Sequence, residues 1–298
     1  MNSFAYFRLA TSNLVTRHVL PIFTLFCFIL IPISASTAQE VLRIGGTGSA
    51  LAAMKSLVAE YAKSHPDINI VIVPSLGSGG GIKALIAGKI DISLSARALK
   101  DKEKAKGVAA AIYARAPMVF ATHQSNVASD VPFSQLASAY SGQNLKWQDG
   151  LPLRPIMRPA SESDIKIIRS LSVEIDAAVQ VALNNTNLFV ALNDQDNADA
   201  LERVPGSLGF LSLGQVRAEQ RKIKILSVNG VTGTLDGVVD GTYPHAKTHR
   251  IVLAKACKPV IQAFIEFLFS AEGKAILTST GHATQSAPDD INQCLGAK

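Results

Sequence analysis

The sequence predicts an α/β fold built on a parallel sheet. Short β-branched runs alternate with segments whose apolar residues recur at helical spacing, beginning at Val41. Three strands and two helices are expected between Val41 and Leu94, which requires right-handed crossover connections. Loops rich in Gly and Ser follow the first two strands, at the carboxyl edge where ligands bind in such sheets.

Composition excludes several classes of protein. The chain has 298 residues, is 48% hydrophobic and is only 17% charged, which is too apolar for a disordered protein. The 29 Lys and Arg exceed the 23 Asp and Glu, but they are spread along the chain, so we expect no nucleic-acid partner. The length allows one large domain or two ordinary ones.

Residues 1–38 have the order of a secretory signal. They contain Arg8, Arg17 and no acidic residue, then the apolar stretch Ile22–Ile33, then small residues ending at Ala38. The alternative is a membrane anchor, but 12 residues span about 18 Å as a helix against a hydrocarbon core of ~30 Å. We therefore predict a cleaved signal peptide over 1–38 and a soluble, secreted mature protein.

The mature chain keeps two cysteines, Cys257 and Cys294. In an oxidising compartment an even pair predicts one disulfide that closes a C-terminal loop. The alternative is two buried thiols.

The expected elements follow in order. Leu51, Met54, Leu57, Val58 and Tyr61 define the first helix, and His65-Pro66 ends it. Early strands are expected over 41–44, 68–73 and 90–94, with helices over 49–63 and 82–87. Later strands are expected over 118–122, 155–158, 207–213 and 250–253, with helices over 132–141, 164–171, 260–269 and 273–277.

Three motifs carry the candidate site. Gly45-Gly46-Thr47-Gly48-Ser49 joins a strand to a helix, where backbone N–H groups and a hydroxyl make an anion site or an ordinary capped turn. Gly77-Ser78-Gly79-Gly80-Gly81 repeats this arrangement after the next strand, and four glycines in five residues are costly for a mere turn. Neither motif has nucleotide-binding spacing.

The third motif is Arg158-Pro159-Ala160-Ser161-Glu162-Ser163-Asp164, which precedes a helix. Arginine offers a planar fork of donors that matches an oxyanion, and Ser163 or Asp164 is a natural helix cap. The alternative is a capped helix beside a surface arginine.

No motif demands catalysis or a cofactor. The six histidines include no metal-binding pattern, and we expect His245 and His249 to lie on solvated surface. No GxSxG motif and no arrangement of Cys with His is present, so the sequence predicts neither an enzyme nor a metal site.

Taken together, these motifs resemble the periplasmic phosphate-binding proteins of ABC transporters. The resemblance runs through GGTGSA, GSGGGIKALIAGKIDISLSARALKDKE, the segments at Pro132–Trp147 and Pro205–Leu213, and FIEFLFSAEGKAILTSTG near the end. It covers the mature chain in order.

The resemblance implies a type 2 periplasmic-binding-protein fold. This fold has two lobes, each a mostly parallel sheet flanked by helices, joined by two hinge strands that let the lobes close over the ligand. By analogy, lobe 1 is 39–117 plus 246–298, and lobe 2 is 118–245.

Position by position, the resemblance assigns the ligand-binding residues. Ser49, the N–H of Ala50, Ser78, Gly79 and Arg158 match phosphate contacts. Hydroxyls are expected after the arginine, and the candidates are Ser161 and Ser163. Further candidates for the site are Thr47, Gly48, Ser95, Arg97, Glu162 and Asp164.

Two departures from the family pattern stand out. Ser95 is followed by Ala96-Arg97, where many members have an Asp that accepts the phosphate proton. Glu162 and Asp164 stand where Ser and Thr are expected, and a carboxylate facing a dianion is repulsive. Three explanations are open. In the one that we favour, Ser161 and Ser163 supply the hydroxyls and Asp164 only caps the helix. Alternatively, Glu162 or Asp164 accepts a phosphate proton, or the ligand is not phosphate.

The resulting prediction is a monomeric, non-enzymatic solute-binding protein that captures phosphate and delivers it to an ABC transporter permease. The alternatives are a binder of molybdate, tungstate or sulfate, or a sensor or adhesion protein on the same fold that binds a protein partner.

Overall fold

The computed structural model of the chain describes residues 40–143, 145–254 and 257–287. The predicted signal peptide and Cys294 lie outside these residues. Cys257 is half-buried and disulfide-bonded, but its pairing with Cys294 stays a prediction. Within the described ranges no helix is both long and apolar enough to cross a membrane.

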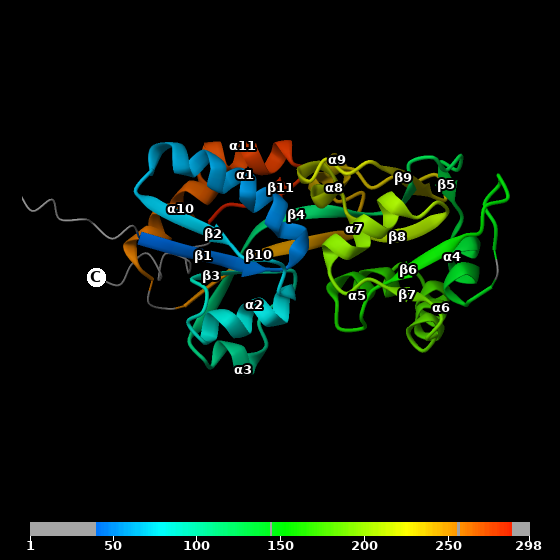
Figure 1. Cartoon of the computed structure of the whole chain (residues 1–298), viewed down its shortest axis with the longest axis horizontal. Helices are drawn as coiled ribbons and strands as arrows, with labels where there is room; N and C mark the ends of the chain where they lie inside the picture. Colours follow the sequence, from blue (N-terminus) through cyan, green and yellow to red (C-terminus); the bar gives the residue numbers. More distant parts are fainter. Residues whose placement is uncertain (1–39, 144, 255–256, 288–298) are drawn as a thin grey trace, which may run out of the picture. The chain divides into compact units, whose positions relative to one another are not determined.

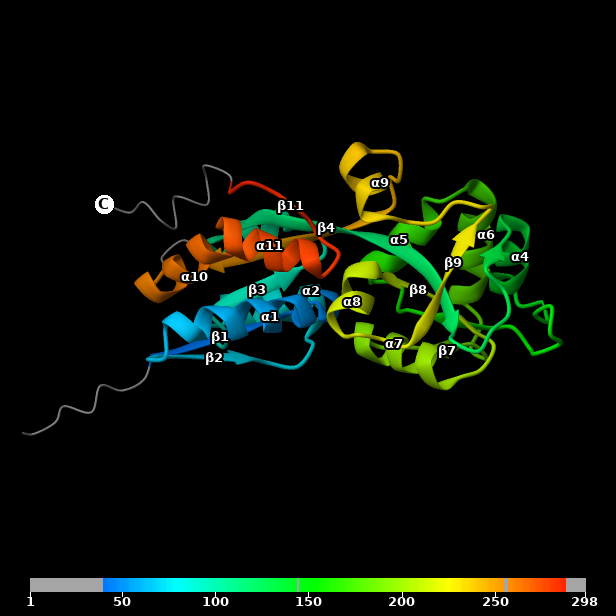
Figure 2. The ribbon, with the colours of Figure 1, turned by 90° about the horizontal axis from the view of Figure 1, so that it is seen from above.

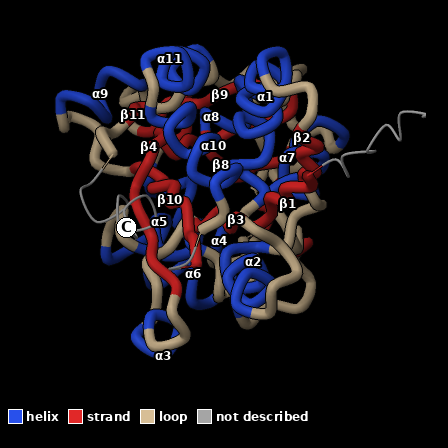
Figure 3. Tube along the Cα trace, turned by 90° about the vertical axis from the view of Figure 1, so that its left-hand side faces the viewer, coloured by secondary structure: helices blue, strands red, loops and turns tan. Residues whose placement is uncertain are grey.

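The first half of the fold is the strand–helix alternation that the sequence predicts. Strands β1 (Glu40–Gly46), β2 (Ile68–Ile72) and β3 (Ile92–Ser95) run parallel in the order β2-β1-β3. Helices α1 (Gly48–Ser64) and α2 (Gly77–Ile86) connect them. The two helices lie on opposite faces of the sheet (Figures 1 and 3), and both begin at the carboxyl ends of strands.

Helix α2 begins five residues earlier than the predicted start at Ile82, because its glycines are part of the helix. A Cβ atom at Gly81 would lie 2.7 Å from the Cα atom of Gly46 and 2.7 Å from Ser93 Oγ. The glycines therefore let α2 approach β1 and β3 more closely than any other residue type would allow.

Two long strands, β4 (Val108–His123) and β10 (Ala246–Ala254), make the sheet mixed. Every antiparallel pairing among the described strands involves one of them. Strand β4 pairs with β10 up to Pro117 and with β8 (Ser207–Ser212) from Met118 onward. It runs as one curved strand through both sets of elements (Figure 2). The predicted strands over 118–122 and 250–253 are only the more apolar parts of β4 and β10.

The second half repeats the parallel arrangement. Strand β6 (Arg154–Met157) pairs in parallel with β8 on one side and β7 (Phe189–Val190) on the other. The remaining elements are α3 (Asp101–Lys104), β5 (Asp130–Val131), α4 (Phe133–Tyr140), α5 (Ser163–Arg169), α6 (Val173–Leu183), α7 (Asp194–Arg203), α8 (Leu213–Ala218), β9 (Ile223–Val228), α9 (Leu235–Asp240), α10 (Pro259–Phe269), α11 (Ala271–Ser279) and β11 (Ala283–Thr284).

The apolar cores are separate. One core packs α1, α10 and α11 on β1, β3 and β10, with Leu57 and Phe264 at its centre. Another packs α4, α5 and α6 on one face of β4 and β8, and a third packs α7 and α8 on the other face. The first core contains β4 residues that precede Pro117, whereas the other two contain β4 residues from Met118 onward. This separation supports the two lobes that we propose, 39–117 with 246–298 and 118–245.

Candidate functional site

Arg158 is buried at the carboxyl end of β6, with 2% of its surface exposed. Its Nη1 donates to the Ala191 carbonyl at 2.6 Å. Its Nε and Nη2 have no hydrogen-bond acceptor among the described residues. Three carboxylates stand just beyond hydrogen-bond distance: Asp164 at 3.5 Å from Nε, and Glu162 and Asp194 at 3.6 and 3.9 Å from Nη2. The guanidinium is therefore attracted to these carboxylates but keeps two donors unused.

A second buried cation, Lys247, lies opposite on β10. Its Nζ is 2.6 Å from Asp164 Oδ1 and 2.7 Å from Asp194 Oδ1, and all three side chains are almost completely buried. Burial alone would lower the pKa of Lys247, but the two aspartates outweigh burial and raise it. We call Arg158, Lys247, Asp164, Asp194 and Glu162 the buried charge cluster.

The cluster holds two cations and three carboxyl groups. Burial, more than any neighbour, raises the pKa of Glu162, which favours its neutral form. The two cations lie directly against Asp164 and Asp194, and this pairing explains how so many ionisable groups are tolerated away from water.

The N-terminus of α1 points at this cluster. The backbone N–H of Ser49 donates to Asp194, and Thr47 Oγ1 lies 3.4 Å from Asp194 Oδ2. Burial opposes ionisation of Asp194, but Lys247 and Arg158 outweigh it and lower the pKa of Asp194. A Cβ atom at Gly48 would lie 2.3 Å from Gln195 Oε1 and 3.0 Å from Asp194 Cβ, so a larger residue would have to displace the Gln195 side chain and shift Asp194.

Ser49 itself does not cap α1. The helix is capped at Thr47 without a side-chain hydrogen bond, and Ser49 Oγ lies 3.2 Å from His249 Nε2. Ala50, the next residue of α1, is completely buried. The prediction of solvated surface was wrong for His249, which is completely buried. The alternation of β10 places His249 and Lys247 on its inward face together with Ile251.

The N-terminus of α2 faces Glu162. Gly77 has φ of +65°, and a Cβ atom there would lie 3.9 Å from Glu162 Oε1. Ser78 Oγ accepts a hydrogen bond from the Ala96 backbone at 2.9 Å. Gly79 is exposed, and a Cβ atom built on it would lie 3.7 Å from Arg97 Nη2.

Other predicted residues have local partners. Arg97 pairs with Glu103 at 2.7 Å, and Ser95 Oγ donates to the Arg97 carbonyl at 2.8 Å. Ser161 is exposed in the turn before α5, and Ser163 Oγ lies 3.4 Å from Asp164 Oδ1.

The expectation that Asp164 only caps α5 was wrong. Residue 162 is the N-cap of α5 and makes no side-chain capping bond. Asp164 lies instead in the buried charge cluster, where its two oxygens face Lys247 and Arg158. The Asp164 carboxylate is attracted to two buried cations more strongly than to the N-terminus of α5, where water could replace a capping hydrogen bond.

The structure thus joins Thr47, Gly48, Ser49, Arg158, Glu162 and Asp164 in one place, as the motifs predict. It adds Lys247, Asp194 and His249, which sequence reasoning missed. Asp194 lies in an acidic amphipathic helix, and that pattern predicts exposure of its charged side chains to solvent. The period-two pattern of β10 was the available signal for Lys247 and His249, because Lys247, His249 and Ile251 share one face.

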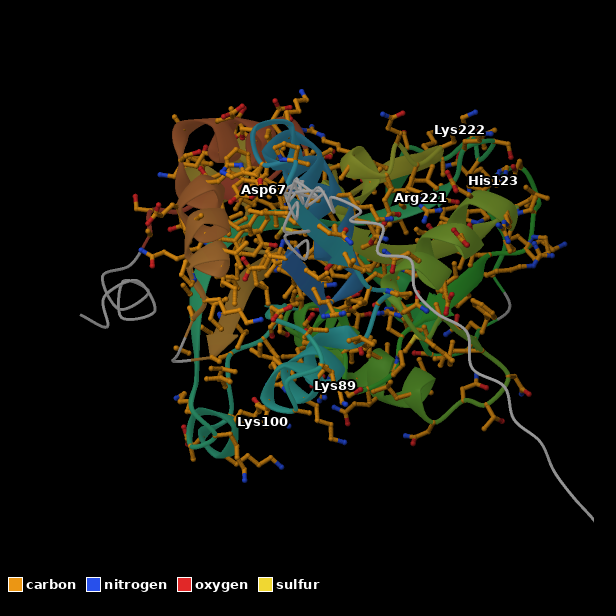
Figure 4. All side chains as sticks on the ribbon, turned by 60° about the vertical axis from the view of Figure 1, so that its left-hand side comes forward. Asp67, Lys89, Lys100, His123, Arg221 and Lys222 are labelled. Atoms are coloured by element: carbon orange, nitrogen blue, oxygen red, sulfur yellow. The ribbon has the colours of Figure 1, made fainter. Side chains whose placement is uncertain are left out.

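A separate cavity of about 810 Å³ lies beside the contact of α1 with α7. Its lining includes Leu51 and Lys55 of α1 and Gln195 of α7, but none of the seven main predicted ligand residues. Arg221, labelled in Figure 4, lines its edge and pairs with Asp199, Glu202 and Glu219. These pairs stabilise the wall of the cavity. Among the described residues, no three Asp, Glu, His or Cys side chains are grouped to hold a metal ion.

Comparison with known proteins places the chain in a family. A family model described as a PBP superfamily domain matches residues 34–272. Protein SphX of Synechococcus elongatus is 25% identical over 273 residues, covering 82% of this chain and 78% of that protein. The phosphate-binding protein PstS of Staphylococcus epidermidis is 26% identical over 275 residues, covering 84% and 83%.

The fold agrees with this placement. A substrate-binding protein from Clostridium perfringens, solved with bound phosphate, superposes with a TM-score of 0.69 at 20% identity, covering 83% of this chain and 100% of that one. The chain belongs to the PBP superfamily, a family of solute-binding proteins and not of enzymes, and is a distant homologue of the PstS phosphate-binding proteins.

Proposed function

We propose that this chain captures phosphate, or a closely related tetrahedral oxyanion, between its two lobes and delivers it to an ABC transporter permease. The observation that carries the proposal is the buried Arg158 guanidinium, whose Nε and Nη2 donors have no acceptor among the described residues. A buried donor without a partner is costly, and a bidentate oxyanion is the ligand that fits a guanidinium fork. The relatives that bear phosphate-binding names cover most of the chain.

The ligand groups are those that the sequence predicts. Arg158 supplies the charge, the N-termini of α1 and α2 supply N–H donors from Ser49, Ala50 and Gly79, and the hydroxyls of Ser78, Ser161 and Ser163 lie on the surrounding loops and helix starts. Helix N-termini favour anions through both their free N–H groups and the helix dipole. The N-terminus of α1 faces Asp194 and that of α2 faces Glu162, and both carboxyl groups lie within 3.9 Å of Arg158, which supports an anion rather than a neutral solute.

Glu162 bears on the form of the bound anion. Burial raises the pKa of this carboxyl group, and a neutral carboxyl group can donate a hydrogen bond to an oxyanion instead of repelling it. We therefore revise the favoured explanation of the acidic pair: Glu162 shares a proton with the bound anion, and Asp164 holds Lys247 in place.

Calorimetric titration of the purified mature protein with phosphate tests the proposal. Arg158→Ala should weaken phosphate binding by at least about a hundredfold, because it removes the buried charge that pairs with the ligand. Arg154→Ala is the matched control: Arg154 is exposed on the same strand, and we expect its loss to leave the affinity unchanged. Equal affinity in wild type and Arg158→Ala would place the ligand elsewhere.

Export to the periplasm, docking to a permease and a monomeric state belong to the same proposal. They rest on the sequence of residues 1–38 and on the family. A permease interaction distinguishes the transport role from a sensor or adhesion role, because only the former requires the loaded protein to stimulate transport by membranes that contain the permease.

A further inference from the structure

We propose that Asp194 is an intramolecular anion that occupies the oxyanion position at the N-terminus of α1, so that a free oxyanion binds by displacing it. The inference rests on the proposed function and concerns the regulation of the same site. Asp194 lies at the start of α7, in the 118–245 part of the chain. Its carboxylate reaches across to α1 and β10, in the other part.

The contacts of Asp194 are those expected for a bound anion. It accepts from the Ser49 backbone N–H, lies 3.4 Å from the Thr47 hydroxyl, and has Lys247 at 2.7 Å and Arg158 at 3.9 Å. It is 4% exposed. A helix N-terminus, a hydroxyl, a lysine and an arginine converge on one carboxylate, which is the donor set that a free oxyanion would use.

The contacts next to Asp194 hold it in this position. Gln195 Nε2 donates to the Gly48 carbonyl at 3.0 Å, and the Gln215 side chain donates to the Asp194 carbonyl at 3.1 Å. The close approach of Gly48 to both Asp194 and Gln195 fixes the start of α7 against the start of α1. The carboxylate is therefore already positioned and competes at high effective concentration.

Charge balance gives the consequence for binding. With Asp194 in place, the two cations of the cluster face Asp164 and Asp194, and no positive charge remains for a solute. When Asp194 withdraws, the site loses one negative charge, and the donors that held the carboxylate face the solute. The wild-type chain should therefore bind phosphate more weakly than a chain in which residue 194 carries no charge.

The first test compares phosphate affinity in three proteins by calorimetric titration. Asp194→Asn should bind phosphate on the order of tenfold or more tightly than wild type, because the competent state is no longer depleted by the internal anion. Asp196→Asn, the same change two residues along the first turn of α7, should match wild type. Equal affinity in wild type and Asp194→Asn would overturn this inference while leaving phosphate binding intact.

The second test does not need phosphate to be the ligand. In Asp194→Ala, added acetate or formate should take the place of the lost carboxylate and raise the unfolding temperature, whereas wild type and Asp196→Asn should not respond. If Asp194→Ala does not fold in plain buffer, the same anions should restore folding. Rescue by acetate without phosphate binding in any variant would keep this inference and reject the proposed function. No response to acetate, formate or phosphate would reject the inference.

Discussion

Lys247 is the residue on which the buried charge cluster depends. It contacts both Asp164 and Asp194, and removing it leaves two carboxylates facing only Arg158. We expect Lys247→Met to lower the free energy of unfolding by about 3–5 kcal/mol, because a buried ion pair is broken from one side. Urea denaturation measures this.

The control for this variant is Lys258→Met. The Lys258 side chain is 61% exposed and lies 3.8 Å from Asp91, so its loss should change the free energy of unfolding by less than about 0.5 kcal/mol. An equally small effect of Lys247→Met would mean that the cluster does not stabilise the fold.

His282 gives the protein a dependence on pH. Its ring is buried against Gly214, and burial lowers its pKa to about 4. The unfolded chain binds a proton below pH ~6.5 and the folded chain does not until about 4, so stability falls as pH drops through this window. The loss attributable to His282 is about 3 kcal/mol.

Urea denaturation at a series of pH values measures this loss. His282→Gln should have a shallower decline than wild type between pH 6.5 and 4, since the replacement does not titrate. His123→Gln, at a site labelled in Figure 4 and away from the core, should decline like wild type. Parallel curves for His282→Gln and wild type would contradict the assignment.

At the residue scale, the sequence predicted the position of a side chain where a motif places that residue just after the end of a strand. Ser49 and Arg158 each follow a strand and were placed at the carboxyl edge correctly. Asp194 was missed because its burial depends on partners more than 30 residues away in sequence, which no local pattern records. Lys247 and His249 were missed although the alternation of β10 places them on one face with Ile251.

At the scale of elements, the packing of α2 on the sheet depends on Gly81. A Cβ atom there would meet backbone and Ser93 Oγ at 2.7 Å. We expect Gly81→Ala to cost about 1–3 kcal/mol of stability through overpacking. Gly79→Ala, in the same helix, adds a Cβ atom that meets only the end of the Arg97 side chain at 3.7 Å. We expect this substitution to raise stability by about 0.5–1 kcal/mol through helix propensity.

Thermal and urea unfolding of these two variants distinguish packing from propensity. If both glycine substitutions stabilise the protein, α2 does not lie as close to β1 as described. The sequence predicted that a helix follows Gly77–Gly81 but not that the glycines are inside it, because helix propensity alone argues against them. Close packing outweighs that propensity here.

The same limit applies to the strands. The apolar ends of β4 and β10 were predicted, while the rest of each strand was not, because Ala, Arg and Lys residues dilute its pattern. Their antiparallel pairing, which makes the sheet mixed, also left no local signal. The bounds of the parallel strands β1, β2 and β3 were predicted to within two residues, because each is a short β-branched or apolar run that a glycine-rich loop or a helix follows.

At the scale of the whole molecule, one covalent link is predicted. Cys257 is disulfide-bonded, and the sequence predicts Cys294 as its partner. Peptide mapping of the unreduced mature protein should find a Cys257–Cys294 linked peptide, and reduction should lower stability by about 4 kcal/mol for a loop of this length. Two alkylatable thiols in the unreduced protein would contradict the pairing.

The division into two lobes also belongs to this scale. It was inferred from the family resemblance and is supported by the separate apolar cores and by the change of β4 partners after Pro117. The buried charge cluster joins the two parts, because Arg158, Asp164 and Asp194 come from one and Lys247 from the other.

Equilibrium binding of phosphate to the purified mature chain tests the central claim most directly. We expect saturable binding of one phosphate per chain that is lost in Arg158→Ala, with weaker or no competition from sulfate and molybdate. Absence of binding to phosphate, sulfate and molybdate alike, in a protein shown to be folded, would contradict the account.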